Sequence, residues 1–475
     1  MYERALAIIF IILCIGQIWA LRWGRLTAVA YYISVASLQY FSLWMFVTWS
    51  PDRVCGLLLI LGTLVFYRKP ESIYNKSNSL LFVFFAYIVI ITLLSSFFWP
   101  VSAMRVQSAA YGPLRAYIQI FNWGVVIGSA WQIALALGEK EAFDKIRNWF
   151  IGLGTFHCSV ALYQVVAYWS HLPVPGIRRV AVGVGLDFND PQLAIATIGG
   201  LGLYRPTSFT GEPRSLAGVS MLWIAALFTL YTEGRISWYG RLCMAISLIV
   251  LVLTLSTSGW GGFFCCVASL LYLISRQKGS GLGGLFILAL MLGILLTVDS
   301  TGWLPESVSV KTVFEDRWSK RLSNPFEDLP VKMTLDILSD NPQVNIWGAG
   351  AGGMSFYIAN RLGGSELIYA STVSFVNFIG DLGLVGLFLM LAAMWGGARN
   401  FLSNRVNCDP TCRNLAFMGF VFLCQYLISA PSYMLATSFG FLLASQFRFQ
   451  VLANSLTNIN DCRHDAEEED DAGSH

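Results

Sequence analysis

Apolar segments close to the length of a membrane-spanning helix recur along most of this chain, and they restrict its fold more than any other feature. A helix needs roughly 20 apolar residues to cross the hydrocarbon core of a bilayer. We expect thirteen such helices, over residues 5–21, 27–49, 54–66, 79–99, 117–137, 149–169, 215–232, 242–257, 259–274, 281–298, 376–395, 415–430 and 434–447. Charged residues make up 12% of the chain, which is about half their share in a soluble domain.

Backbone groups in lipid hydrogen-bond only within the protein, so long continuous apolar segments indicate helices and not barrel strands. The expected fold class is therefore all-α, a polytopic integral membrane protein. Because segments 54–66 and 434–447 are short enough to be tilted, re-entrant or interfacial, we expect about 12–14 transmembrane helices. Residues 1–448 would form the membrane domain. Residues 449–475, with the acidic run Asp465–Asp471, are expected to form a disordered cytoplasmic tail.

Basic residues in the short loops predict how the helices are oriented. The loops that would share one face contain fifteen lysines and arginines, at positions 22, 25, 68, 69, 76, 140, 145, 147, 235, 241, 276, 278, 399, 405 and 413. The opposite short loops hold little beyond Arg53, Arg105 and Arg115. The positive-inside rule places the first set in the cytoplasm. Two long polar loops, residues 171–214 and 299–370, then both lie on the extracytoplasmic face.

The first long loop ends in the segment Arg205-Pro-Thr-Ser-Phe-Thr-Gly-Glu-Pro-Arg-Ser-Leu-Ala217. Pro213 suits the first turn of a helix, so Glu212 and Arg214 are expected at the outer mouth of the next span. Glu212 could serve only the helix dipole there, an interaction worth about 0.3–1 kcal/mol. Arg214 opposes the same dipole and therefore needs a compensating anion, either Glu212 or a ligand.

The second long loop carries Arg317 and Arg321, which would share one face of a helix, and then a proline that can open a further helix. That helix should end before Asn341-Pro342 and be followed by the run Trp347-Gly-Ala-Gly-Ala-Gly-Gly353. The run lacks the Gly-Lys-Ser/Thr of a phosphate-binding loop, and no strand precedes it as in a dinucleotide site. Its glycines permit close backbone approach, which suits either plain packing or a tight turn beside a bulky ligand.

An acidic residue, Asp381, interrupts the apolar segment that follows, and Asn377 precedes it by four residues on the same helical face. A carboxylate in lipid is costly without a partner. We therefore expect Asp381 to be a functional or a structural centre.

Four segments of the chain resemble signature motifs of O-antigen and exopolysaccharide polymerases, which belong to the O-antigen polymerase/ligase superfamily. They are Arg205…Phe209…Glu212-Pro213…Ser215…Ala217, Leu255-Ser-Thr-Ser-Gly259, Asn341-Pro342…Gly348-Ala-Gly350 and Asp381-Leu-Gly383-Leu-Val-Gly386. Their order and the expected topology agree over residues 149–395. The chain departs from the motifs at Trp260, near where an arginine is usual. It also has Thr372 near where the related ligases have a histidine, which favours a polymerase over an O-antigen ligase.

The resemblance implies a C-type glycosyltransferase architecture in the bacterial inner membrane. It implies an undecaprenyl-diphosphate-linked oligosaccharide as substrate and no metal or nucleotide cofactor. Membrane lipids and a polysaccharide chain-length regulator are the other expected partners, and nucleic acid is not expected as one.

On this hypothesis the protein joins lipid-linked repeat units into O-antigen, capsule or exopolysaccharide. Arginines would hold the departing diphosphate, and a carboxylate would accept the proton of the attacking hydroxyl. We assign the first task to Arg205, Arg214, Arg317 and Arg321, and the second to Glu212. The residues expected to contact substrate are Arg178, Arg179, Lys332, Asn341, Gly348, Gly350, Asn377 and Asp381. Arg178 and Arg179 could instead meet lipid headgroups.

Two other functions fit parts of the pattern. An O-antigen ligase would share the architecture. A transporter or flippase of lipid-linked oligosaccharides would share the substrate, but secondary transporters are commonly built from repeated halves, and no internal repeat is evident in this sequence.

Overall fold

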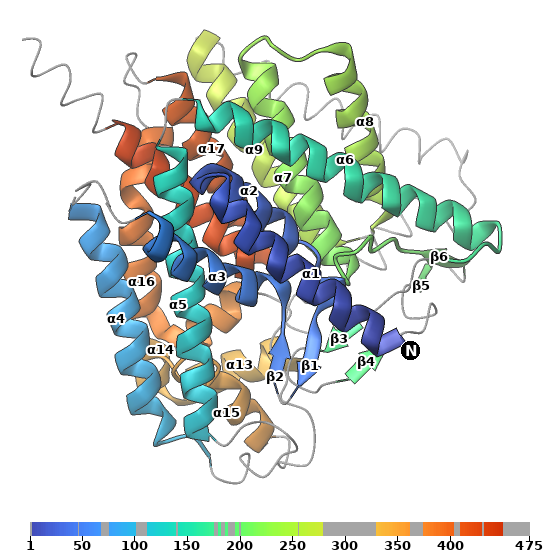
Figure 1. Cartoon of the computed structure of the whole chain (residues 1–475). Helices are drawn as coiled ribbons and strands as arrows, with labels where there is room; N and C mark the ends of the chain where they lie inside the picture. The colour runs from blue at the N-terminus through green and yellow to red at the C-terminus, as the bar shows by residue number, and fades with distance from the viewer. Residues whose placement is uncertain are drawn as a thin grey trace, which may run out of the picture.

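The computed structural model describes residues 2–45, 47–67, 76–100, 112–138, 141–174, 179–181, 186–188, 195–198, 201–254, 256–278, 329–361, 374–402, 409–429 and 432–449. These residues form a bundle of helices (Figure 1), which confirms the all-α, polytopic prediction. Seven described helices are long and apolar enough to cross a membrane, over Arg4–Arg22, Ser79–Ser96, Leu114–Leu137, Ala142–Trp169, Pro213–Thr232, Ser374–Asn400 and Pro410–Ile428. The chain is therefore a multi-pass membrane protein.

The first part of the chain is largely helical. Its elements are α1 (Tyr2–Arg22), α2 (Arg25–Ala36), the 3-10 helix η1 (Gln39–Phe41), α3 (Pro51–Phe66), α4 (Lys76–Ser96), α5 (Gly112–Leu137) and α6 (Ala142–Trp169). The second part contributes α7 (Pro213–Thr232), α8 (Trp238–Leu253), α9 (Thr257–Lys278), α13 (Leu329–Asp340), α14 (Pro342–Trp347), α15 (Met354–Arg361), α16 (Ser374–Leu402), α17 (Pro410–Ser429) and a helix over residues 432–449.

Short antiparallel hairpins are the exception to helical structure in the described residues. The pairs are β1 (Leu43–Met45) with β2 (Val47–Trp49), β3 (Arg179–Ala181) with β4 (Leu186–Phe188), and β5 (Ile195–Ile198) with β6 (Leu201–Tyr204). Two of the hairpins lie in the first long loop. Strands of three or four residues cannot cross a bilayer, so they do not alter the class of the fold.

The expected span over residues 27–49 is wrong, because α2 ends at Ala36 and the chain turns into η1 and the β1–β2 hairpin. Polar side chains take the last carbonyl groups of α2. Ser37 Oγ donates to Ser34 O at 2.6 Å, and Gln39 Nε2 donates to Ala36 O at 2.6 Å. Hydropathy does not reveal that polar side chains compete for the backbone groups at the end of a helix.

Other expected segments fare differently. The segment 376–395 lies in α16 but is interrupted at Gly383, and residues 281–298 and 450–475 lie outside the described residues. The total of twelve to fourteen spans and the disordered tail therefore stay predictions.

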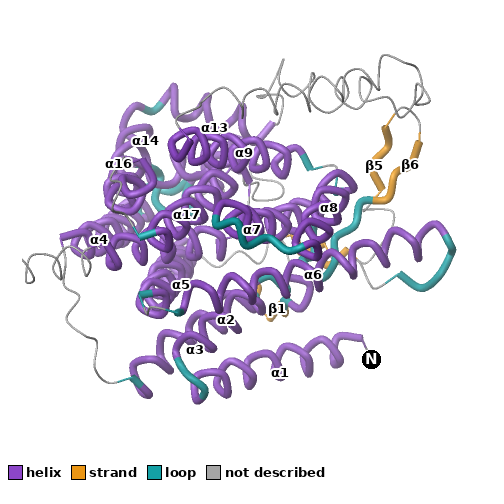
Figure 2. Tube along the Cα trace, turned by 90° about the horizontal axis from the view of Figure 1, so that it is seen from above, coloured by secondary structure: helices purple, strands orange, loops and turns teal. Residues whose placement is uncertain are grey.

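α7 is the central helix of the bundle, and every residue from Ser215 to Leu227 is buried. Its sequence is apolar on all sides, as expected of a helix enclosed by other helices. Gly154 of α6 allows close packing here, because a Cβ at this position would lie 2.5 Å from the Cβ of Trp223. Figure 2 shows α7 and α17 inside the bundle and α1 at its edge.

The two ends of the bundle collect the loops that the sequence sorted into two sets. One end, which we call the basic end, brings together the start of α6, the end of α7 and the start of α17 through Arg147, Glu233 and Asn414. The opposite end therefore holds the start of α7 and the end of α17. We call it the loop end, because the first long loop enters α7 there and the segment α13–α15 meets α4, α5 and α16 at this end (Figure 1).

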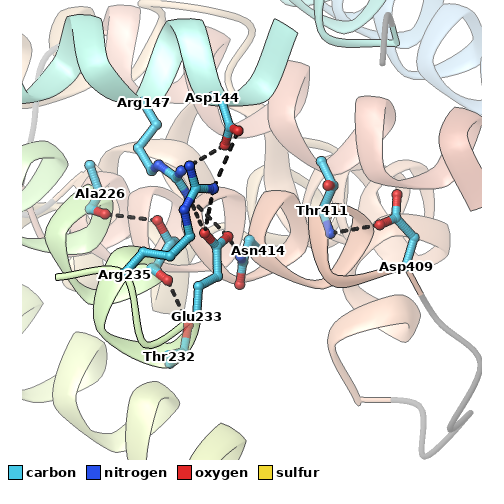
Figure 3. A network of polar contacts seen from close by, with 10 residues as sticks. Asp144, Arg147, Ala226, Thr232, Glu233, Arg235, Asp409, Thr411 and Asn414 are labelled. Carbon is cyan, nitrogen blue, oxygen red and sulfur yellow. Dashed lines mark hydrogen bonds and ion pairs between the residues drawn. The ribbon is translucent and has the colours of Figure 1, made fainter. Parts of the chain in front are cut away.

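A buried arginine holds the basic end together (Figure 3). The side chain of Arg147 is 1% exposed, and its guanidinium donates to both carboxylate oxygens of Glu233, at 2.8 and 2.9 Å, and to Asp144 Oδ1 at 2.6 Å. Asn414 Nδ2 also donates to Glu233, at 2.7 Å. Arg235 lies between the two acids, and its hydrogen bond to Asp144 and the charges of Asp144 and Glu233 raise its pKa. The network thereby fixes three helix ends to one another.

We expect Arg147→Ala to lower the free energy of unfolding by about 3–5 kcal/mol, because it leaves the half-buried Glu233 carboxylate without the buried cation that pairs with it. The matched control is Lys145→Ala, since Lys145 makes an exposed pair with Glu141 that should contribute only about 0.3–0.5 kcal/mol. Unfolding in detergent micelles, followed by circular dichroism, measures both. Equal stabilities of the two variants would contradict the role given to Arg147.

Candidate functional site

Two of the four signature segments contact each other at the loop end. Arg205 Nε donates to the carbonyl oxygen of Thr254, the residue that ends α8, at 2.9 Å. A Cβ at Gly259 would lie 2.7 Å from the Cβ of Ala217. The segment 205–217 and residues 254 and 256–259 therefore form one packed unit, which we call the first cluster; residue 255 lies outside the described residues. Arg205 holds a helix end in it, because a cation is favourable beside the last carbonyl groups of a helix.

Residues of α6 fix the turn that precedes α7. Gln164 Oε1 accepts hydrogen bonds from the backbone N–H groups of Thr207, at 3.0 Å, and Ser208, at 2.7 Å. The buried imidazole of His157 lies between the hydroxyls of Ser37 and Ser208, 2.9 Å from each. Ser208 has φ of 51°, a left-handed conformation that is unfavourable for serine. These bonds supply the restraint that such a conformation requires.

Our sequence analysis missed His157 and Gln164. The available signal was their position, since polar side chains inside the expected span 149–169 need partners in lipid. Both side chains hydrogen-bond to Ser208, in the turn that precedes Glu212.

Glu212 and Arg214 pair with each other at the mouth of α7. Pro213 opens the helix as predicted, and Glu212 is its N-cap residue. The Glu212 side chain accepts no capping hydrogen bond, so any stabilisation of the helix start by Glu212 is electrostatic. Its Oε2 instead lies 2.5 Å from Arg214 Nε. Both side chains keep contact with solvent, 21% exposed for Glu212 and 45% for Arg214, so the pair is open to a ligand.

An aromatic group attaches η1 and α6 to the first cluster. The ring of Phe209 stacks on Phe41 and Phe156, with centroids 5.6 and 6.0 Å apart, and its carbonyl accepts from the Tyr40 N–H at 3.0 Å. Beside η1, the buried carboxylate of Asp52 accepts hydrogen bonds from Gln39 Nε2 at 3.2 Å and from Ser432 Oγ at 3.0 Å.

Asp52 is a second buried acid that our sequence analysis did not single out. It lies in the first turn of α3, and Ser432 begins the helix over 432–449. The positive ends of two helices therefore compensate its charge.

The other two signature segments also contact each other. Asn341 caps α14, as the predicted helix boundary requires, and its Nδ2 donates to Ile337 O at 2.9 Å. A Cβ at Gly348 would lie 2.6 Å from the Cα of Leu382, and one at Gly383 would lie 2.5 Å from the backbone nitrogen of Gly348. Only glycine permits this approach. We call the contacting segments, 341–353 and 381–386, the second cluster.

Gly383 interrupts α16 at this contact. Its φ of 67° and ψ of −176° lie in a region that is open essentially to glycine alone. The hydroxyl of Tyr87 donates to the freed carbonyl oxygens of Leu382, at 2.9 Å, and Trp347, at 2.6 Å. Tyr87 lies midway along α4, so the break and the end of α14 lie within the membrane-spanning part of the bundle. Non-helical backbone at that depth must be satisfied by protein or water.

Side chains of α4 and the loop after it satisfy the glycine-rich turn as well. Trp99 Nε1 donates to Ala349 O at 2.7 Å, and Thr92 Oγ1 accepts from the N–H of Ala351 at 3.0 Å. A Cβ at Gly350 would lie 3.1 Å from Ser95. Among the two interpretations of the glycine run, the described contacts favour packing.

Asp381 faces the start of α15. Its Oδ1 accepts from the N–H of Met354 at 3.1 Å, and the positive charge of Arg115 acts on it from α5. A carboxylate at a helix N-terminus is stabilised by the dipole, so Asp381 is a structural centre that anchors α15 to α16. Asn377, one turn earlier on α16, is half-buried, whereas Lys332 is exposed on α13.

α17 lies between the two clusters. Its residue Tyr426 interacts electrostatically with Asp381 of the second cluster. Its Ile428 contacts Gly261, two residues beyond the Leu255–Gly259 segment, since a Cβ at that glycine would lie 3.0 Å from it. Both clusters therefore belong to one end of the molecule, on either side of the end of α17.

Not every expected site residue is placed. Arg178, Arg317 and Arg321 lie outside the described residues, and of Arg179 the structure describes the backbone, paired with Phe188 in the β3–β4 hairpin. The expected convergence of arginines from both long loops therefore stays a prediction. Within the described ranges, no three His, Cys, Asp or Glu side chains gather in a way that could hold a metal ion.

We expect Gly383→Ala to destabilise the protein by at least about 2 kcal/mol, because alanine is strained at this backbone conformation and would strike α14. The control is Gly152→Ala on α6, where a Cβ would meet nothing within 4 Å, and where alanine should stabilise the helix by about 0.5–1 kcal/mol. Thermal unfolding of both variants in the same detergent tests the difference. A stable Gly383→Ala protein would show that the break in α16 is not required.

Comparison of the chain with protein-family models and with curated protein sequences gives no match. The functional argument therefore rests on the two clusters and on their place at one end of a multi-pass helical bundle.

Proposed function

We propose that this protein is a metal-independent glycosyltransferase that polymerises polyprenyl-diphosphate-linked repeat units into a surface polysaccharide. One observation carries the proposal. The four segments that resemble polymerase motifs are dispersed over almost two hundred residues of sequence, yet they pack in two pairs at the same end of the bundle. Chance resemblances would have no reason to assemble in this way.

The loop end would then face the extracytoplasmic side of the bacterial inner membrane. Described members of the set that the positive-inside rule assigns to the cytoplasm, among them Arg147 and Arg235, lie at the basic end. Lipid-linked repeat units would enter the loop end from the membrane, and the growing polymer would leave toward the outside.

The Glu212–Arg214 pair supplies both functional groups that the transfer needs. The hydroxyl oxygen of the acceptor sugar attacks the anomeric carbon of the growing glycan, and the bond from that carbon to the diphosphate oxygen breaks. The diphosphate leaves with the electron pair, and Arg214 is placed to bind its oxygens. The hydroxyl proton passes to the Glu212 carboxylate, which Arg214 orients.

Arg205 has a positioning role in this proposal. Its Nε is bonded to Thr254 O, so it sets the distance between the segment 205–217 and the turn into α9. Arg317 and Arg321 remain the proposed diphosphate ligands from the second long loop.

The direct test incubates the purified protein in liposomes with lipid-linked repeat units and examines the products for a ladder of chain lengths. Absence of a ladder from well-folded protein would reject the proposal.

We expect Arg214→Ala to lower polymer formation about a hundredfold or more, since the loss of one transition-state donor commonly amounts to about 2.7–4 kcal/mol. The control is Arg241→Ala, an exposed arginine on α8 near the basic end, which should polymerise normally. Full activity of the Arg214 variant would remove this residue from the reaction.

We expect Glu212→Gln to reduce turnover to a similar degree while leaving the fold intact, because glutamine keeps the shape of the side chain but accepts no proton at neutral pH. Product formation by the ladder assay and an unchanged thermal midpoint are the two measurements. An equally active variant would mean that Glu212 serves only as a partner for Arg214.

One observation favours a second candidate, a transporter or flippase of lipid-linked oligosaccharides. α16 is discontinuous at Gly383, and discontinuous helices form the substrate sites of many secondary transporters. A deletion strain separates the candidates, because loss of a polymerase leaves single repeat units on the surface, whereas loss of a flippase leaves none. Loss of an O-antigen ligase would instead leave unattached polymer.

A further inference from the structure

Arg115 lies beside the second cluster and has no assigned role. It is in the first turns of α5, and its Nη2 donates to Ser355 Oγ of α15 at 3.3 Å. Its guanidinium carbon lies 5.4 Å from the centre of the Phe356 ring, which stacks on Trp99 with centroids 4.6 Å apart. The cation is therefore held at a fixed place by a ring and a hydroxyl.

The hydrogen-bonding capacity of Arg115 is largely unused. A guanidinium has five N–H donors, and among the described residues none accepts a hydrogen bond from the buried Nε. Its interaction with Asp381 is electrostatic, and the Asp381 Oδ1 atom already accepts from the Met354 N–H. A buried donor without an acceptor is costly, so the arrangement favours binding of an additional acceptor.

The other arginines of the loop end are engaged differently. Arg214 pairs with Glu212, and Arg361 at the end of α15 pairs with Asp340. Arg205 donates to the carbonyl of Thr254. The hydrogen bond of Arg115 goes to the neutral hydroxyl of Ser355, so its guanidinium can still bind an anion.

We propose that Arg115 binds the phosphate-bearing part of a lipid-linked substrate, an inference that rests on the proposed function. Arginine presents forked donors that match phosphate oxygens. Arg115 begins a membrane-spanning helix, which is the depth at which the phosphate of a membrane lipid lies. Phe356, which is itself stacked on Trp99, lies beneath the guanidinium and restricts its rotation, so the fork is oriented before the ligand arrives.

The alternative is that Arg115 only balances Asp381 and ties α5 to α15. The two interpretations predict different effects of a substitution at Ser355. If the tie to α15 is the role, removal of the Ser355 hydroxyl should mimic removal of the arginine, and if the balance of Asp381 is the role, Arg115→Lys should bind as the unmodified protein does. If the role is binding, the Ser355 variant keeps the cation and should keep the ligand.

The experiment measures binding of radiolabelled farnesyl diphosphate to the purified full-length protein in detergent. We expect Arg115→Ala to weaken binding about tenfold or more and Arg115→Lys to weaken it less, because lysine keeps the charge without the fork. Ser355→Ala and the matched control Arg361→Ala, an arginine of α15 that faces Asp340, should bind the probe as the unmodified protein does.

Unchanged binding by Arg115→Ala would overturn the proposal, and so would an equal loss in Ser355→Ala. Competition distinguishes the two sources of phosphate. Farnesol should not displace the probe, and displacement by phosphatidylglycerol as efficient as by farnesyl diphosphate would assign the site to a phospholipid headgroup and overturn the substrate assignment.

The proposed function and this inference can fail separately. A ladder of products at the normal rate from Arg115→Ala would overturn the inference and leave the polymerase standing. Probe binding that depends on Arg115, in a protein that makes no polymer, would do the reverse.

Discussion

Backbone groups released inside the membrane-spanning part of the bundle need hydrogen-bond partners from the protein, and the second cluster is built around that requirement. Gly383 breaks α16 and frees the carbonyl of Leu382, and the end of α14 frees the carbonyl of Trp347. One hydroxyl, that of Tyr87, takes both. Trp99 and Thr92 do the same for the glycine-rich turn. Irregular backbone persists at this depth because α4 and Trp99, which follows it, supply the missing hydrogen-bond partners.

Buried charged groups also need partners from the protein, and the two ends of the bundle supply different kinds of partner. At the basic end, Arg147 has two carboxylate partners and forms a network with Arg235. At the loop end, Asp381 and Asp52 rely mainly on the starts of helices and on neutral donors. The basic end is thus closed by its own ion pairs. The loop end keeps cations, those of Arg214 and Arg115, with capacity for an external anion.

This difference between the two ends is consistent with the proposed function. A transfer reaction on a lipid diphosphate needs fixed positive charge and a proton acceptor near the membrane surface, with little else to move. Hydrogen bonds from α6 to Ser208 and the aromatic group around Phe209 fix the turn before Glu212. The groups are held before substrate arrives, and such preorganisation makes electrostatic stabilisation effective.

Sequence alone determined the membrane class, the sorting of loops between two ends, the start of α7 at Pro213 and the end of α13 before Asn341. These properties depend on local composition and on the fixed φ of proline. It also offered Glu212 as the partner of Arg214, since a cation in a first turn needs an anion nearby. Tertiary structure decided the rest. That α2 stops at Ala36, that Arg205 meets Thr254 and that Asp381 anchors α15 depend on residues brought together from distant parts of the chain. Hydropathy and residue spacing show which polar or charged groups are costly to bury. Only the packing of the helices determines which partner compensates each of these groups.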